Sequence, residues 1–143
     1  MEYEILPHTA DLRIRARGKT REELFLNALR GMSAVLQPLD AVRGRPAAVS
    51  RGGGDVRREV KLSSPDSASL LIDFLSEALA LSQINREVYT DVTFDELAEK
   101  SLRGTLIGLP VSGLEKDIKA VTYHGVEIRE TDAGYEATVI YDI

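Results

Sequence analysis

Both ends of this chain have the pattern of β-strands, and this constrains the fold more than any other feature. The segment 3–6 is a short strand candidate, and the 143 residues stop at Ile143 inside the alternating segment 135–143. Strands need hydrogen-bonded neighbours, so we expect neither end to be a loose tail. If the ends meet, Asp11, Asp142 and the α-carboxylate of Ile143 bring three acids together, which suits a hard cation.

The spacing of these acids does not show that they meet. The ordinary alternative is that they lie far apart and that Asp142 is a solvated strand residue. Taken by itself, the spacing favours this alternative. Asp73, on an otherwise apolar helix face, is either a fourth acid of the cluster or a residue that caps or pairs near a helix boundary.

The first half of the chain predicts a strand and two helices. Segment 12–17 alternates apolar residues with three arginines, which is typical of a half-buried strand. Thr20 and Glu23 form a capping box, which predicts a helix to about Leu36. A second helix, roughly 68–83, is apolar on more than half its circumference and is therefore expected to be the central buried helix.

Further strands are predicted along the rest of the chain, over 56–62, 88–94, 102–110, 118–131 and 135–143. The last two form a hairpin around residues 132–134. Few connections are of the parallel crossover type, so the sequence predicts an α+β fold in which two helices pack on a mostly antiparallel mixed sheet. We expect one domain over residues 1–143, with a flexible loop at about 40–55, where glycines and arginines gather.

Composition excludes several classes of function. The chain has no cysteine, so it has no disulfide, thiolate metal site or cysteine nucleophile. Its net charge of −5 argues against broad electrostatic binding to nucleic acid. It begins without the pattern of a signal peptide, and no apolar run approaches the ~20 residues that span a bilayer. We therefore expect a cytoplasmic protein that does not enter membranes.

Short catalytic motifs are absent as well. The sequence has no phosphate-binding loop of the GxxxxGK[ST] type, no GxSxG elbow and no HExxH zinc helix. Of the two histidines, His124 is expected to be a partly exposed residue of the strand 118–131. His8 lies three residues before Asp11 and either neighbours that acid or is satisfied by the backbone of a turn. Lys119 has the pattern of a solvated strand lysine.

Three motifs give the chain a resemblance to a known family. The opening HTADLRIRARG, followed by TREELFLNALRGM, resembles the archease family, and so does the middle segment SLLIDFLSEAL. The closing segments KAVTYHGVEI and YEATVIYDI are similar to the C-terminal signature of that family. The resemblance covers nearly the whole chain except residues 40–55, which are more basic than the family pattern leads us to expect.

The resemblance implies a small α+β protein that assists tRNA processing and is not itself an enzyme. Archeases activate the tRNA-splicing RNA ligase by promoting its guanylylation and its multiple turnover. Members also act as chaperones or specificity modulators of a tRNA cytosine-5 methyltransferase. We accordingly expect the ligase as partner, the methyltransferase as a second client, and only indirect contact with tRNA.

The same resemblance implies a set of site residues. The family's divalent-metal site carries over to Asp11, Asp142 and the main-chain carboxylate of Ile143, with calcium as the metal. Lys119 matches a family position tied to activation of the ligase. His8 matches the motif, without an assigned role in the family, and we group it with Lys119 as a candidate for partner activation.

Two other classes of function stay open from the residues. Clustered acids that bind a divalent ion can activate water, which describes a small metal-dependent hydrolase. Alternatively, the arginines of segment 12–17 and those of the loop 40–55 could bind RNA phosphates directly, which describes a tRNA-binding chaperone module.

Overall fold

The computed structural model describes residues 2–6, 11–36, 56–114 and 117–143. Within these ranges the elements follow the order β1 (Tyr3–Leu6), β2 (Asp11–Gly18), α1 (Arg21–Leu36), β3 (Val56–Ser63), α2 (Ser67–Asn85), β4 (Glu87–Leu97), β5 (Ser101–Pro110), β6 (Ala120–Thr122), β7 (Ile128–Thr131) and β8 (Gly134–Asp142). The loop expected at 40–55 lies outside the described residues, and so does His8.

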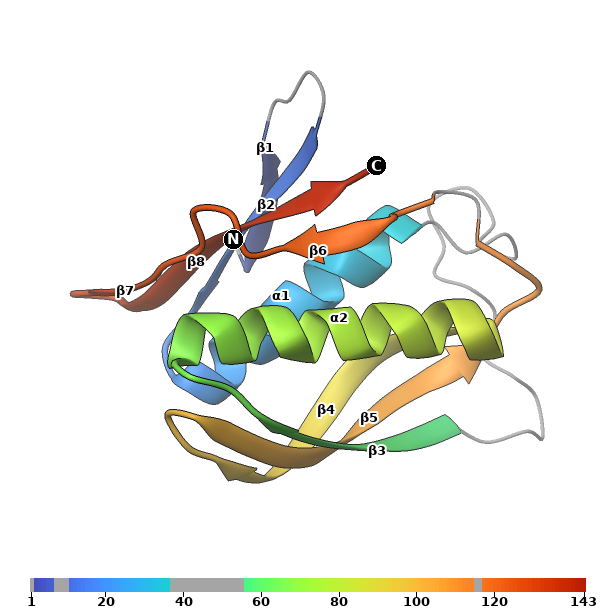
Figure 1. Cartoon of the computed structure of the whole chain (residues 1–143), viewed down its shortest axis with the longest axis horizontal. Coiled ribbons are helices and arrows are strands. Elements are labelled where there is room, and N and C mark those ends of the chain that lie inside the picture. Colours follow the sequence, from blue (N-terminus) through green and yellow to red (C-terminus); the bar gives the residue numbers. More distant parts are fainter. Residues whose placement is uncertain (1, 7–10, 37–55, 115–116) are drawn as a thin grey trace.

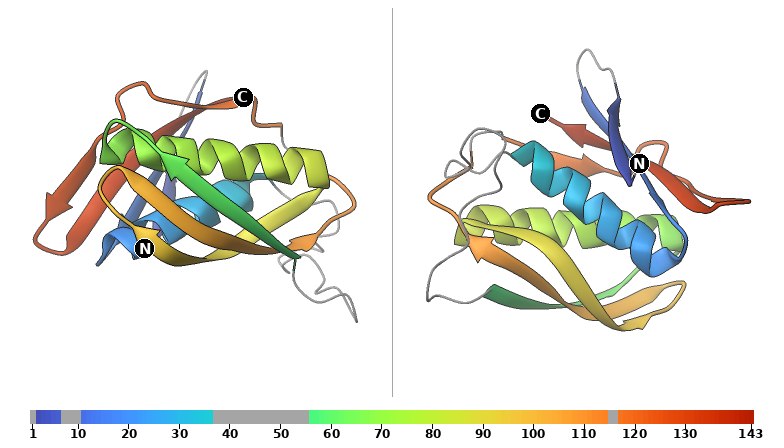
Figure 2. Two further views of the ribbon diagram at one scale, coloured as in Figure 1. Left: turned by 60° about the horizontal axis from the view of Figure 1, so that its bottom comes forward. Right: turned by 180° about the vertical axis from the view of Figure 1, so that it is seen from behind.

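The strands form two antiparallel sheets with both helices between them (Figure 1). One sheet has the order β1-β2-β8-β6, with β7 also paired to β8, and the other has the order β3-β5-β4. The predicted α+β class and the two helices are confirmed, but the strands divide into two sheets where one was expected. Figure 2 shows the same layering from two further sides. A helix that is apolar around most of its surface needs a layer on each side, which one sheet cannot supply.

The core joins both helices to both sheets. Phe25 of α1, Phe74 of α2 and Phe94 of β4 lie with their ring centroids 5.6–6.2 Å apart. Aromatic pairs at such separations contribute about 0.5–1.5 kcal/mol beyond the area they bury. These three rings therefore fix the two helices against the three-stranded sheet.

Helix α2 is the central element of this core. By length and composition it is the one helix among the described residues that could cross a bilayer, although the sequence analysis expected no such segment. A mostly buried core helix passes the same test of length and hydropathy. Here the apolar residues of α2 pack between the sheets, and Leu70, Leu71, Ile72, Phe74 and Leu75 are fully buried.

The helix ends show how the sequence sets their bounds. The Glu23 N–H donates to the Thr20 hydroxyl at 3.1 Å, as the capping box predicts. The Glu23 carboxylate, however, accepts from the Lys19 N–H at 3.3 Å and not from Thr20. At the start of α2, Asp66 accepts from the Ser69 N–H at 2.7 Å, and this bond lowers the pKa of the Asp66 carboxyl. The helix runs to Asn85, two residues beyond the predicted region, and its C-cap residue Arg86 has the left-handed conformation (φ 55°).

Strand β4 departs from the alternation that its sequence suggested. Its register with β5 shifts between Tyr89 and Asp91, and again between Phe94 and Glu96. Each shift is a β-bulge, which inserts one residue and reverses the sense of the alternation. The glycines opposite the two aromatic residues are the reason β5 approaches so closely: a Cβ on Gly108 would lie 2.0 Å from a β4 carbonyl oxygen.

The prediction of one continuous strand over 118–131 is wrong. It consists of β6 and β7, separated by a turn that contains Gly125 at φ +64°. His124 is therefore an exposed turn residue and not a strand residue. The neighbouring Tyr123 donates its hydroxyl to Asp73 of α2, which also accepts from Ser64. The hairpin around residues 132–134 is confirmed, with Thr131 opposite Gly134.

Candidate metal centre

Strand β8 lies in the middle of the five-stranded sheet and brings the two ends of the chain together. Asp142, its last residue, is directly opposite Asp11 of β2 on one side and Ala120 of β6 on the other. The Lys119 N–H donates to the Asp142 carbonyl oxygen at 2.8 Å. Figure 1 shows β2, β8 and β6 side by side, with the C-terminus at this end of the sheet. Asp11, Asp142 and Lys119 are thus neighbours.

Both aspartates lie on the outward face of the sheet. Their strand neighbours Leu12 and Tyr141 are 3% and 0% exposed and point into the core. Because side chains alternate along a strand, Asp11 and Asp142 point the other way. Directly opposite residues on antiparallel strands have Cβ atoms about 4.5–5.5 Å apart. The two carboxylates are therefore within reach of one cation.

A third oxygen donor depends on Ile143. Its side chain packs against the core, which holds the main chain that follows Asp142 near the sheet. Among the described residues, no three His, Asp or Glu side chains gather into a metal-ligand group. The two aspartates therefore need a main-chain carboxylate to complete a set of three. All donors of this set are carboxylate oxygens, which calcium prefers and soft metals do not.

The arginines of β2 lie in the same outward row, and two of them are firmly paired. Arg15 contacts Glu4 of β1 at 3.1 Å, and Arg17 contacts Glu4 at 3.1 Å and Glu136 of β8 at 3.0 Å. Hydrogen bonds to Glu136 and Glu4 raise the pKa of Arg17. The sequence analysis missed both glutamates. Each acid lies in a segment predicted to be a strand, but the sequence did not show that these strands pair with β2.

Arg13 is paired differently. Its Nε atom lies 3.7 Å from Asp11 Oδ1, and the two side chains are 50% and 34% exposed. The register places Leu6 and Ile140 directly beside Arg13, so neither neighbouring strand offers it an acid straight across. A guanidinium therefore already lies at one of the two aspartates. Arg13 therefore partly neutralises Asp11.

The remaining candidates lie elsewhere or cannot be placed. His8 lies outside the described residues, so its relation to Asp11 stays a prediction. Asp73 is bound to Ser64 and Tyr123, and the Asp73 interaction raises the pKa of Tyr123. It therefore ties α2 to the β6–β7 turn from within the helix and not at its boundary, and it belongs to no group of three acids among the described residues.

A second polar cluster, which the sequence analysis did not identify, is buried beside the three-stranded sheet. Arg58 of β3 donates to both oxygens of Glu87, at 2.9 and 2.7 Å, and the Tyr89 hydroxyl donates to the same carboxylate at 2.6 Å. The Arg58 bonds hold the pKa of Glu87 below its ordinary value, while burial raises the pKa of Tyr89. Every oxygen of Glu87 is thereby satisfied, which is typical of a structural element.

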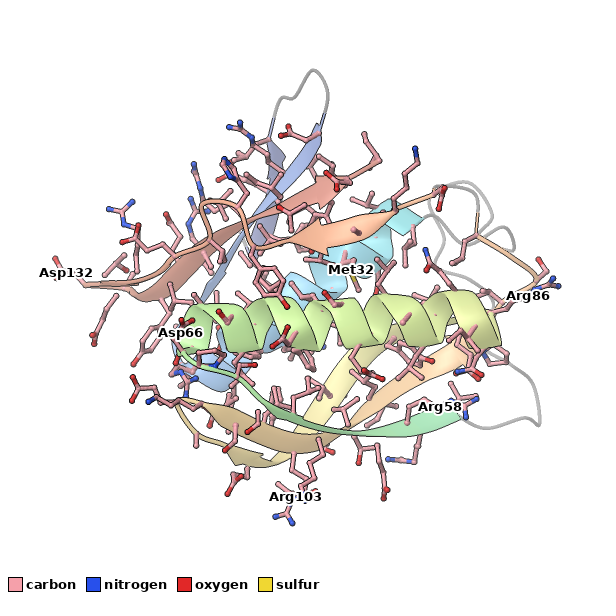
Figure 3. The ribbon with its side chains drawn as sticks, viewed as in Figure 1. Met32, Arg58, Asp66, Arg86, Arg103 and Asp132 are labelled. Atoms are coloured by element: carbon pink, nitrogen blue, oxygen red, sulfur yellow. The ribbon has the colours of Figure 1, made fainter. Side chains whose placement is uncertain are left out.

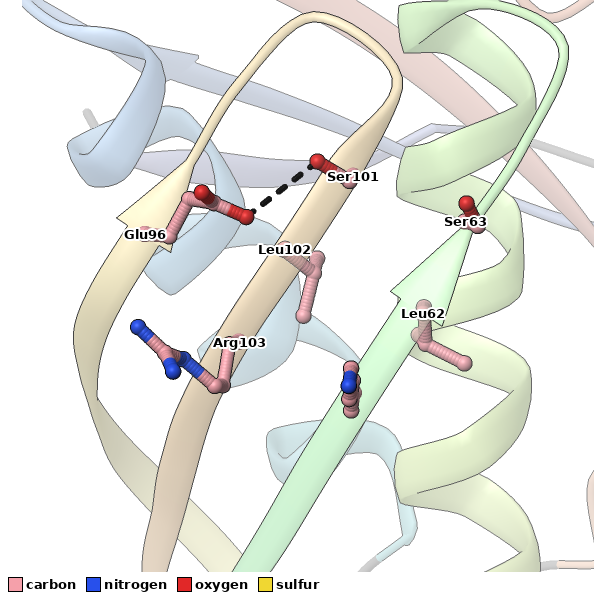
Figure 4. A pocket seen from close by; sticks show the side chains of 7 residues that line it. Leu62, Ser63, Glu96, Ser101, Leu102 and Arg103 are labelled. Carbon is pink, nitrogen blue, oxygen red and sulfur yellow. Dashed lines mark hydrogen bonds between the residues drawn. The ribbon is translucent and has the colours of Figure 1, made fainter.

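A shallow pocket on the three-stranded sheet is one of several hollows that contain polar groups. It has a volume of about 470 Å³ and is lined by Lys61, Leu62, Ser63, Glu96, Ser101, Leu102 and Arg103. Figure 4 shows Ser101 donating to Glu96, at 3.3 Å. The lining contains no histidine, and of its two serines Ser101 donates to Glu96, whose carboxylate is exposed. It lacks the nucleophile–base–orienter arrangement of covalent catalysis.

Comparisons with known proteins identify the fold and the family together. The family described as "Archease protein family (MTH1598/TM1083)" matches residues 3–143. The chain is 38% identical to the protein archease of Methanosarcina barkeri, over 99% of this chain and 96% of that protein. It is 31% identical to the protein archease of Methanothermobacter thermautotrophicus, over 99% and 98%. The chain belongs to the archease family.

Solved structures agree with this assignment. The solution structure of Methanobacterium thermoautotrophicum protein 1598 superposes with a TM-score of 0.71 at 29% identity, covering 99% of each chain. The crystal structure of an archease from Thermotoga maritima, described as a possible chaperone, superposes with a TM-score of 0.62. At 16% identity, over 96% of this chain and 94% of that one, this second likeness shows the fold alone.

Proposed function

We propose that this protein is a non-catalytic activator of the tRNA-splicing RNA ligase, which acts through a divalent-cation site at the end of the five-stranded sheet. The observation that carries the proposal is the direct pairing of Asp11 with Asp142. It supports the cluster that the family resemblance implies and counts against the alternative in which the acids lie far apart. Membership of the archease family supports the accessory, non-enzymatic role.

The cation would be held by the carboxylates of Asp11 and Asp142 and by the main-chain carboxylate of Ile143. Two carboxylates about 4 Å apart repel by about 1 kcal/mol in bulk water, or about 4 at an effective dielectric of 20. A bound dication removes this repulsion and supplies a positive centre at the sheet end. Calcium is the metal we propose, because all three donors are hard oxygens.

Lys119 lies beside the proposed cation site, where we propose that the partner binds. Its backbone is fixed to Asp142, and its side chain is exposed, so it can reach a partner that approaches the acids. We propose that the ligase contacts Lys119 and the cation site together, with His8 as a further contact. A partner held at two fixed points can be stabilised in one conformation, here the one competent for guanylylation.

Guanylylation of the ligase tests the proposal. We expect wild-type protein, at substoichiometric concentration, to raise the rate and allow multiple turnover, and the Asp11→Asn, Asp142→Asn double variant to abolish both effects. Asp132→Asn is the matched control, because this exposed acid lies at the tip of the β7–β8 hairpin, away from the site (Figure 3). Full activation by the double variant would refute the metal-site role.

A C-terminal extension tests the third ligand separately. Residues added after Ile143 remove the free carboxylate at that position but leave β8 and its register intact. We expect weaker calcium binding and weaker activation with an unchanged unfolding midpoint in the absence of metal. Unchanged calcium affinity would remove Ile143 from the ligand set while leaving the aspartate pair in place.

A chaperone for a tRNA cytosine-5 methyltransferase is the second candidate. It is favoured by family membership and by three large apolar side chains that are more than half exposed: Ile5 at 52%, Tyr123 at 56% and Ile84 at 76%. Light scattering of the methyltransferase, with and without this protein, tests it. Suppressed aggregation with wild type, but not with Ile84→Ser, would support a chaperone that uses this side chain.

Direct RNA binding through β2 is less well supported. Arg15 and Arg17 are neutralised by Glu4 and Glu136, so they do not offer free charge to phosphates. The arginines of the loop 40–55 lie outside the described residues. A hydrolase also lacks support, since the described residues around the acids include no base that is positioned by a third group. We propose that the protein acts in the cytoplasm, beside its partner enzymes.

A further inference from the structure

We propose that Arg13 is a built-in competitor of the divalent cation: its guanidinium neutralises Asp11 in the metal-free protein and must leave when a metal binds. The inference rests on the proposed metal site and adds a residue that sets the affinity of that site. It follows from Arg13, Arg15 and Arg17, which share one face of β2 but differ in their ion pairs with carboxylates.

The comparison among these arginines is internal to β2. Arg17 contacts Glu4 at 3.1 Å and Glu136 at 3.0 Å, and Arg15 contacts the same two acids at 3.1 and 3.9 Å, so each has acidic partners on the strands on both sides. Arg13 has one acidic contact, at 3.7 Å, and its side chain is half exposed. An ion pair this long and this exposed contributes little and exchanges readily with solvent. Of the three, Arg13 is therefore the one that can move away from its acid without breaking a network.

The register explains why the acidic partner of Arg13 is Asp11, which is also a proposed metal ligand. Directly across from it are Leu6 on β1 and Ile140 on β8. Asp142 lies two residues beyond Ile140, which makes it the diagonal neighbour of Arg13, and long side chains reach diagonal positions. Arg13 is consequently adjacent to both aspartates. No other basic residue of the described chain forms an ion pair with either of them.

The chemistry of the guanidinium makes the competition permanent. Arginine does not lose its proton in proteins, so its charge is present at every working pH. A dication that enters the site must replace Arg13 at Asp11 and then tolerate a positive charge beside it. In the metal-free protein, Arg13 partly neutralises the acid pair. In the metal-bound protein, the positive charge of Arg13 weakens binding of the ion. Arg13 therefore keeps the affinity below what the carboxylates alone would give.

Calcium binding to the protein with a free C-terminus, measured by isothermal titration calorimetry, tests this inference. We expect Arg13→Gln and Arg13→Thr to bind calcium about three- to tenfold more tightly than wild type, which is the range expected for removing one exposed charge next to the ion. Threonine suits an exposed strand position, so the second variant guards against loss of folding. Arg13→Lys keeps the charge and should remain within about twofold of wild type.

Arg103→Gln is the charge-matched control. It removes one exposed arginine from the three-stranded sheet, so the net charge changes equally but the site does not. We expect its calcium affinity to stay within about twofold of wild type, because exposed charges beyond a Debye length of ~8–10 Å are screened. Unfolding in the absence of metal, followed in urea, shows whether any variant differs in stability.

The outcomes separate this inference from the proposed function. If both neutral Arg13 variants bind calcium as wild type does, or tighten no more than Arg103→Gln, Arg13 is not a competitor, although the metal site stands. If wild type binds neither calcium nor manganese, the metal site itself fails and the role of Arg13 fails with it. Tighter binding by both neutral variants, with Arg13→Lys unchanged, establishes the competition.

Discussion

Glu87 and Asp142 are both acids on β-strands, but their surroundings are opposite. Glu87 is 5% exposed, and its two oxygens accept three hydrogen bonds from Arg58 and Tyr89. Asp142 is exposed, and directly across from it lies another acid, Asp11. The oxygens of Glu87 are satisfied by neighbouring side chains, whereas Asp142 lies opposite a second acid of like charge.

This difference separates an acid that stabilises the fold from an acid that we propose to be a cation ligand. Removing a buried partner leaves an uncompensated group, so the Glu87 cluster is costly to break. Placing like charges directly opposite on neighbouring strands is destabilising, so the pair at the sheet end works against stability. Arg13 compensates for part of this repulsion, and we propose that a bound cation compensates for the rest. The following experiments test the contrast.

The largest effect is expected from Glu87→Gln. The variant keeps the shape of the side chain but removes the charge that Arg58 and Tyr89 recognise, so we expect the free energy of unfolding to fall by about 2–3 kcal/mol. Urea unfolding followed by circular dichroism measures it. Glu59→Gln, on an exposed position of β3, should change stability by less than about 0.5 kcal/mol. Equal losses in the two variants would show that the buried Glu87 carboxylate contributes no more to stability than an exposed one.

The same carboxylate predicts a pH dependence. Because Arg58 lowers the folded pKa of Glu87 below the ordinary value of 4.5, the stability that Glu87 contributes is complete above that pH. It is lost as the pH falls through the lower, folded pKa. We therefore expect most of the difference between wild type and Glu87→Gln to disappear below pH 4.5. A difference that stays constant from pH 7 to pH 3 would contradict this.

Metal should stabilise the sheet end by a smaller amount. At a free calcium concentration ten times the Kd, linkage predicts a gain of about 1.4 kcal/mol in the free energy of unfolding. The Asp11→Asn, Asp142→Asn double variant should gain nothing at the same concentration. Thermal unfolding with calcium and with a chelator gives the comparison. A gain of equal size in the double variant would place the ion elsewhere.

The smallest effect is expected from Asp142→Asn without metal. Neutralising one of two opposed acids relieves their repulsion, so we expect a slight rise in the unfolding midpoint in a chelating buffer. The rise should be smaller than the gain that saturating calcium gives wild type. A clear loss of stability would instead mean that the Asp142 carboxylate makes a structural contact, and the contrast with Glu87 would weaken.

Local patterns allowed much of the fold to be predicted. The alternation of 12–17, the Thr20 cap and the apolar surface of α2 each depend on neighbours in sequence, and each predicts the element that forms there. The division into two sheets depends on which strands pair, which no local pattern encodes. The bulges of β4 lie beside Gly104 and Gly108 of β5, and Tyr123, which directly follows β6, is bound to Asp73 of α2, so these features involve contacts with other elements.

The candidate site was predicted on a different basis. The spacing of Asp11 and Asp142 favoured separate, solvated acids, and the resemblance to the archease family reversed that expectation. The register of β2 and β8 now supports the pairing. Glu4 and Glu136 were missed because salt bridges between strands appear only when the pairing is known. Arg13 was noticed as part of a basic row, but its distinct role depends on Leu6 and Ile140 lying beside it.

The central position of β8 has a consequence for synthesis. Residues 134–142 form the strand that connects β2 to β6 and β7, so a growing polypeptide that lacks them cannot assemble the larger sheet. Pairing of segments so distant in sequence carries a high cost of loop closure and is slow. Asp11 and Asp142 can therefore pair only after residues 134–142 have been synthesised, and a chain truncated before β8 lacks the acid pair.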